Sequence, residues 1–239
     1  NLFPAFSNDN LKQFSFFDSA GGSYCNKFVI DRLNRFYVER KMQPYAPNAP
    51  SSLGGEEMDE AYKKIAELLN INENNIYFGP STSQNTYVLA NSVREMNPGR
   101  KTIIVTNQDH EANSGVWRKL SKYGFKIVEW SVDKKTGLLN LKELKKLINE
   151  DVLIVAFPHC SNIIGYINPV KDICKIIKSN GSYSCVDGVS YAPHGFPDLK
   201  QIECDIYLFS TYKTFGPHIG IMYLSKNLSQ RLPNQGHFF

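Results

Sequence analysis

The chain has 239 residues, of which 42% are hydrophobic and 13% aromatic, which is enough apolar surface for a globular enzyme core. A net charge of +4 spread over short basic pairs argues against nucleic-acid binding, and no apolar run approaches the roughly 20 residues of a membrane span. Five dispersed cysteines without a Cys-x-x-Cys pair argue against a metal site and favour a reducing, cytoplasmic compartment.

Helices and strands are expected in alternation along the chain. Apolar spacing and turn residues predict strands at 76–78, 102–106, 126–130, 152–157, 183–187, 205–209 and 219–224. The same signals predict helices at 58–69, 86–96, 117–123, 141–148 and 169–178. The stretch Gln43 to Gly55 is rich in Pro, Ala, Ser, Asn and Gly and is predicted to be a loop.

Strands separated by helices predict a three-layer α/β/α fold with a mainly parallel central sheet. The run at 152–157 is nearly all apolar, as expected of a strand that is buried on both faces. Ligands of such sheets bind beyond the carboxyl ends of the strands. Each polar motif described below follows a predicted strand, so we expect all of them at one edge of the sheet.

Lys213 and Asp187 each lie at the end of an apolar strand. A lysine amine can form a Schiff base with the aldehyde of pyridoxal 5'-phosphate, and a carboxylate can keep the cofactor's pyridine nitrogen protonated. Most strand-end lysines are solvated surface residues, and an aspartate here could instead cap the next turn. The pair therefore predicts a pyridoxal-phosphate site only in combination with the other motifs.

The segment Gly79 to Asn85 joins a strand to a helix and contains Ser81 and Thr82. Hydroxyls and free amides at a helix N-terminus form a ready site for a phosphate. The alternative is an N-cap cluster without a ligand, since serine and threonine are ordinary capping residues.

Three further strand-end residues could contact a cofactor. His110 could lie against an aromatic ring or act as an acid or base, and the alternative is a surface histidine between two acids. Asn162 could donate to a phenolic oxygen, or it could be a turn residue. Ser190, three residues after Asp187, could also face the site.

Taken in order, these segments resemble the class V aminotransferases, which are fold type I pyridoxal-phosphate enzymes, and in particular the cysteine desulfurase-like branch. The resemblance covers nearly the whole chain. The matching motifs are Phe17-Asp18-Ser19-Ala20-Gly21-Gly22, Asp109-His110-Glu111-Ala112-Asn113, Asp187-Gly188-Val189-Ser190-Tyr191-Ala192-Pro193-His194 and Tyr212-Lys213-Thr214-Phe215-Gly216-Pro217-His218.

The resemblance implies a role for each matching residue. It makes Lys213 the Schiff-base lysine, in an aldimine with the cofactor, and places His110 on the cofactor ring. Asp187 would pair with the pyridine nitrogen and Asn162 would contact the phenolic oxygen. Ser81, Thr82 and Ser210 would hold the phosphate, and Asp18 to Gly22 would lie near the substrate.

Two residues depart from the desulfurase pattern. Ser190 stands where desulfurases usually carry glutamine, and Tyr212 stands where they usually carry histidine before the lysine. None of the five cysteines matches the position of a desulfurase's persulfide cysteine. These departures argue against an efficient desulfurase. The expected substrate is still an amino acid, with desulfuration, transamination and racemisation all open.

The family also carries a smaller C-terminal domain, which we expect to be missing from this chain. Residues 1–239 would then be the cofactor-binding large domain, with an N-terminal segment of about 50 residues packed by the active site. The resemblance further implies a homodimer in the complete protein. The alternative function is a catalytically inactive or truncated cofactor-binding module.

Overall fold

The structure is a computed structural model that describes residues 2–235. Seven strands form one sheet in the order β1-β7-β6-β5-β4-β2-β3. The strands are β1 (Ile76–Gly79), β2 (Thr102–Thr106), β3 (Lys126–Trp130), β4 (Val152–Pro158), β5 (Tyr183–Asp187), β6 (Ile206–Ser210) and β7 (Gly220–Leu224). Each begins within a residue or two of its predicted start.

The strands from β3 to β6 pair in parallel, whereas β7 runs antiparallel to both β6 and β1. The mainly parallel α/β sheet expected from the sequence is therefore confirmed. Because β1 and β6 both oppose β7, they run in the same direction. The carboxyl ends of β1, β2, β4, β5 and β6 consequently meet at one edge of the sheet.

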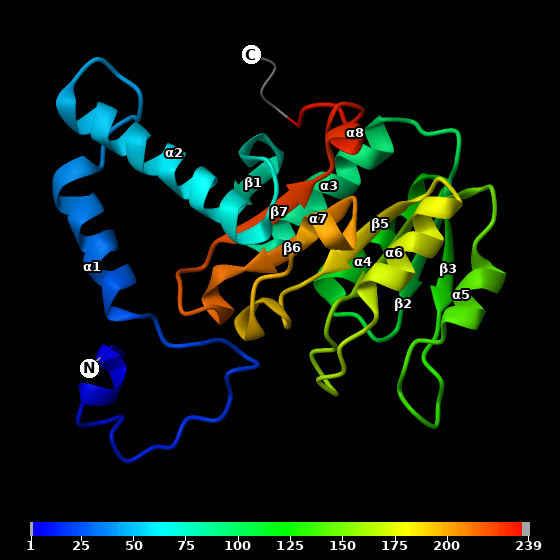
Figure 1. Cartoon of the computed structure of the whole chain (residues 1–239), viewed down its shortest axis with the longest axis horizontal. Helices are drawn as coiled ribbons and strands as arrows, with labels where there is room; N and C mark the ends of the chain where they lie inside the picture. Colours follow the sequence, from blue (N-terminus) through cyan, green and yellow to red (C-terminus); the bar gives the residue numbers. More distant parts are fainter. Residues whose placement is uncertain (1, 236–239) are drawn as a thin grey trace.

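Helices cover both faces of the sheet (Figure 1). The helices are α1 (Lys27–Arg35), α2 (Ala49–Leu69), α3 (Thr82–Glu95), α4 (Glu111–Lys119), α5 (Leu141–Leu147), α6 (Val170–Ser179), α7 (Leu199–Ile202) and α8 (Lys226–Ser229). One apolar cluster lies between the sheet and α2, α5, α6 and α7, and a second lies between the sheet and α3, α4 and α8.

The predicted loop over Gln43 to Gly55 is wrong in its second half, because α2 begins at Ala49. Asn48 caps this helix by accepting a hydrogen bond from the amide of Ser51 at 3.1 Å, and Pro50 stands in the first turn, where its missing amide costs nothing. Gly55 is packed under the ring of Tyr45, and a Cβ at this glycine would lie 2.6 Å from that ring. The small residues that suggested a loop therefore serve close packing within a helix.

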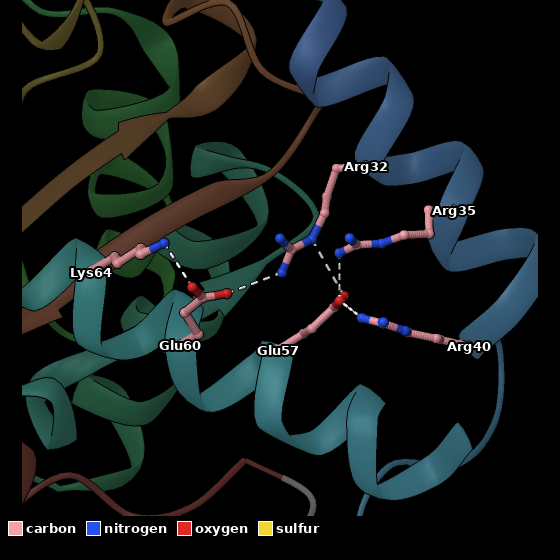
Figure 2. Close-up of polar contacts among 6 residues, drawn as sticks. All are labelled: Arg32, Arg35, Arg40, Glu57, Glu60 and Lys64. Carbon is pink, nitrogen blue, oxygen red and sulfur yellow. Dashed lines mark hydrogen bonds and ion pairs between the residues drawn. The ribbon is translucent and has the colours of Figure 1, made fainter. Parts of the chain in front are cut away.

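The segment from α1 to the first half of α2 projects from the body as an arm (Figure 1). Three arginines, Arg32, Arg35 and Arg40, converge on the half-buried carboxylate of Glu57 (Figure 2). Arg35 Nη2 lies 2.6 Å from Glu57 Oε1, and Arg32 also reaches Glu60 at 3.1 Å. This cluster joins α1 and the π-helical turn Phe36–Arg40 to α2.

We expect Glu57→Gln to increase local opening of α1 by about 1–2 kcal/mol, because three guanidinium groups would then face one another without a carboxylate. Amide hydrogen exchange across residues 27–45 measures this opening. The control is Glu60→Gln, whose partners Arg32 and Lys64 are more exposed and whose loss should have a smaller effect on exchange. Equal exchange in the two variants would contradict a joining role for Glu57.

Candidate active site

A cavity of about 520 Å³, including its open mouth, lies at the shared carboxyl edge of the strands. All eight residues that the sequence singles out line it, although they come from five separate segments of the chain. The lining residues are Ser81, Thr82, Ser83, Asp109, His110, Ala112, Pro158, Cys160, Asn162, Asp187, Val189, Ser190, Ser210, Tyr212 and Lys213.

Lys213 lies in the turn that follows β6, with its Nζ atom 5.9 Å from the centre of the Tyr212 ring. Partial burial lowers the pKa of Lys213, while the nearby carboxylates of Asp187 and Asp18 oppose that shift. The Tyr212 ring is stacked on His218, with the centroids 4.9 Å apart and the planes 8° apart. Partial desolvation of the lysine amine favours its neutral, nucleophilic form.

Asp187 ends β5, and only 5% of its surface is exposed. Its Oδ1 atom accepts a hydrogen bond from the amide of Val189 at 2.8 Å, and no residue in the described range 2–235 forms an ion pair with it. Burial raises the pKa of Asp187, whereas the Val189 amide, His110 and Lys213 lower it. A buried carboxylate with so little compensation calls for a cationic ligand.

Asp109 is a second carboxylate in the same cavity. Burial and the charge of Asp187 together hold the pKa of Asp109 well above its ordinary value. Its two oxygens accept hydrogen bonds from the amide of His110 at 2.9 Å and the side chain of Asn113 at 2.7 Å. The pKa of Asp187 is also raised by burial, but Lys213 and His110 oppose that rise, whereas the charge of Asp187 adds to the rise at Asp109.

The start of α3 meets the end of β6 at a cluster of hydroxyl groups. Thr82 Oγ1 and Ser210 Oγ lie 2.6 Å apart, and both residues are buried. Ser81 caps the helix by accepting from the amide of Gln84 at 3.1 Å. Gly220 of β7 packs directly under this junction, since a Cβ there would lie 2.4 Å from the carbonyl carbon of Ser81. Close packing across three segments therefore sets the geometry of this hydroxyl cluster.

We expect Gly220→Ala to destabilise the fold by about 1–3 kcal/mol, because the added methyl group meets backbone rather than a movable side chain. Gly99→Ala is the matched control, since a Cβ at Gly99 meets nothing within 4 Å. Denaturant unfolding of both variants measures the difference. A Gly220→Ala protein as stable as the control would contradict the close contact with Ser81.

The remaining sequence-derived residues lie around the mouth of the cavity. His110 is the N-cap of α4, and its Nδ1 atom accepts a hydrogen bond from the amide of Ala112 at 3.0 Å, which leaves the proton of a neutral ring on Nε2. Asn162 and Ser190 line the cavity from the turns after β4 and β5. The side chains of the N-terminal motif do not line this cavity.

The N-terminal segment nevertheless contacts the turn that carries the lysine. The amide and hydroxyl of Ser23 both donate to the carbonyl of Tyr212, at 3.0 and 2.9 Å, and the amide of Phe215 donates to the Ser23 hydroxyl at 2.8 Å. A groove beside the cavity lies between these segments, and Asp18, Gly21, Gly22, Cys25 and Tyr212 are among its lining residues.

The sequence reasoning missed several residues at this edge. Asp109 and Cys160 line the cavity, and their positions next to His110 and shortly before Asn162 were the available signal. His159 was not singled out, although it is buried directly after β4 and burial lowers its pKa to about 4. Within residues 2–235, no group of three potential ligand residues could hold a metal ion, and no helix is long and apolar enough to cross a membrane.

Residues 15–236 match the aminotransferase class-V family. The chain therefore belongs to the class V aminotransferases, a family of pyridoxal-phosphate-dependent enzymes, within which its relatives are cysteine desulfurase-like. It is 35% identical to an aminotransferase-like protein FGM3 of Gibberella zeae over 99% of this chain. It is 30% identical to a cysteine desulfurase of Serratia proteamaculans over 97% of this chain.

Solved structures agree with this assignment. A NifS-like protein superposes with a TM-score of 0.83 and 28% identity, covering 88% of this chain and 58% of the other. The apo cysteine desulfurase of Thermococcus onnurineus superposes with a TM-score of 0.86 and supports the fold alone at 24% identity. The chain spans 59% of the G. zeae protein and 58% of the S. proteamaculans protein.

Proposed function

We propose that this protein is a pyridoxal-phosphate-dependent enzyme that acts on an amino acid, with Lys213 as the residue that holds the cofactor covalently. The observation that carries the proposal is the pairing, in one cavity, of a partly desolvated lysine and a buried carboxylate without an ion-pair partner among the described residues. The activity of the whole protein is part of the proposal, as is the assignment of this chain to the cofactor-binding domain.

The residues of the cavity fit this cofactor. A protonated pyridine nitrogen would supply the cation that the buried Asp187 carboxylate lacks. The hydroxyls of Thr82 and Ser210, with the amides at the start of α3, suit a phosphate group. Because Ser81 already caps α3, its contribution would come mainly through its position in this turn.

The remaining residues would orient the ring between these two ends. His110, held by its bond to the Ala112 amide, would lie against the ring and offer Nε2–H. Asn162 would donate to the phenolic oxygen. Ser190 would reach the same oxygen only through water, because its side chain is shorter than the glutamine usual in desulfurases.

Bound pyridoxal phosphate supplies an electron-withdrawing ring that stabilises negative charge on the substrate carbon next to the amine. Lys213 can move the proton at that carbon, since a lowered pKa leaves its Nζ neutral more readily than a surface lysine. The groove beside the cavity, bordered by Asp18 and Gly22, is where the N-terminal segment would meet the substrate. Tyr212 in place of the usual histidine argues against an efficient desulfurase, because tyrosine does not titrate near neutral pH.

We expect the purified protein to be yellow and to form a cofactor adduct that borohydride makes permanent. Lys213→Ala should abolish that adduct, because no other amine is placed at the cavity by the described residues. Mass spectrometry of the reduced protein measures the adduct and its position. Lys175→Ala, at an exposed site on α6, is the matched control and should keep it.

Two outcomes would count against the proposal. A Lys213→Ala protein that retains the adduct would move the covalent role to another lysine. If both variants keep their yellow colour and neither responds spectrally to cysteine, selenocysteine or the common amino acids, a cofactor-binding module without catalysis is favoured.

We expect the full-length protein to be a homodimer. Large apolar side chains are exposed along the arm, including Phe28 at 70% and Val38 at 84% exposure, and burial of such surface against a second copy is favourable. Sedimentation across a concentration series measures the state, and Val38→Glu should shift it toward monomer. A full-length protein that remains monomeric at every concentration would contradict this expectation.

A further inference from the structure

Three aromatic residues, His159, Tyr191 and Tyr207, form a cluster next to the turn that carries Asp187. His159 follows β4, Tyr191 lies in the turn after β5, and Tyr207 lies on β6. His159 Nδ1 and the Tyr207 hydroxyl are 2.7 Å apart. The His159 ring is stacked on Tyr191, with the centroids 3.6 Å apart and the planes 11° apart. One imidazole therefore joins the turns after β4 and β5 to β6, and each of these three segments also supplies residues to the cavity lining.

The cluster lies on the far side of the sheet from the cavity. Val186 and Tyr207 belong to the apolar cluster under α2, α6 and α7, whereas Cys185 and Leu208 belong to the one under α3 and α4. Because successive side chains of a strand point to opposite faces, Asp187 faces the cavity while Tyr207 faces away from it. His159 itself is not among the residues that line the cavity, whereas its neighbours Pro158 and Cys160 both line it.

The backbone connects this cluster to the Asp187 carboxylate. The amide of His159 donates to the carbonyl of Asp187 at 2.7 Å. The amide of Gly188, the residue after Asp187, donates to the carbonyl of Leu208 at 2.7 Å. A Cβ at Gly188 would lie 2.3 Å from the Tyr207 hydroxyl, so the phenol end fills the space beside this glycine. The position of Tyr207 thus limits where the peptide after Asp187 can lie. The next residue along the chain is Val189, whose amide donates to the Asp187 carboxylate.

The cluster is built to stay uncharged. His159 and Tyr207 are buried, and burial lowers the pKa of His159 while it raises that of Tyr207. An apolar pair of rings would fill the same volume, but it would not fix the imidazole and the phenol at one separation and angle. A neutral hydrogen bond supplies that geometry without adding a charge next to Asp187.

We propose that His159, held by Tyr207 and Tyr191, is a positioning residue that sets the placement of the Asp187 carboxylate for a cationic ring nitrogen. The inference rests on the proposed function, since it concerns the partner of Asp187 in the cavity. His159 does not itself touch the ligand. It acts through the Asp187 carbonyl on one side and through Tyr207 against Gly188 on the other.

The test measures the protonation state of the pyridine nitrogen, from the ¹⁵N chemical shift of labelled pyridoxal phosphate bound to the full protein. Wild type should show the protonated nitrogen. Tyr207→Phe removes one buried oxygen and His159→Leu removes the imidazole, and both should shift the signal toward the unprotonated form. Both should also weaken cofactor binding by about tenfold, the usual scale for loss of an outer-shell partner.

Two further variants keep the test specific. His159→Asn retains a hydrogen-bonding group near the place of Nδ1 and should restore the wild-type shift. Tyr223→Phe is the matched control, because Tyr223 is the cross-strand partner of Tyr207 and packs on the same apolar cluster. It should leave both the shift and the affinity unchanged.

The outcomes separate this inference from the proposed function. If Asp187→Asn moves the nitrogen shift while Tyr207→Phe lowers only the unfolding temperature, the cluster is core packing and the inference is overturned. If wild type binds no cofactor, or if Asp187→Asn leaves the shift in place, the assignment of Asp187 itself fails. Should His159→Leu not fold, Tyr207→Phe alone decides the matter.

Discussion

The buried carboxylate of Asp187 is the constraint on which the rest of the site depends. Burial raises its pKa, and within residues 2–235 the Val189 amide and the nearby Lys213 and His110 side chains oppose that shift. A charge in such a position is costly unless a ligand neutralises it. In the proposed function, the cofactor's ring nitrogen would supply that neutralising charge, and its phosphate would lie at the hydroxyl groups of Thr82 and Ser210.

Sheet topology explains why distant segments converge there. The parallel strands from β2 to β6, together with β1, place their carboxyl ends at one edge, so each strand delivers a short polar turn to the same cavity. The alternation of apolar strands with helices made the fold and this convergence predictable from the sequence, since each candidate residue follows an apolar run. Ser81 and Lys213, which are far apart in the chain, could be assigned to one site on that basis.

Other features could not be predicted, because they depend on contacts between segments. The residues of 49–55 read as a loop, yet Gly55 is needed in α2 to pack under Tyr45. His159 follows an apolar strand, as the other candidates do, but its contacts with Tyr207 and Tyr191 appear only in the folded chain. The same holds for Gly220, because its close approach to Ser81 joins β7 to the turn after β1, two segments far apart in the sequence.

Two carboxylates in one cavity raise the question of which one keeps its charge. Asp109 and Asp187 oppose each other's ionisation, but their surroundings differ. Lys213 and His110 favour the charged form of Asp187, whereas the charge of Asp187 adds to burial in raising the pKa of Asp109. A protonated Asp109 remains able to accept from the His110 amide and so to hold the start of α4. The site can thus keep a single negative charge at Asp187, where the neutral cluster of His159 and Tyr207 adds none from behind.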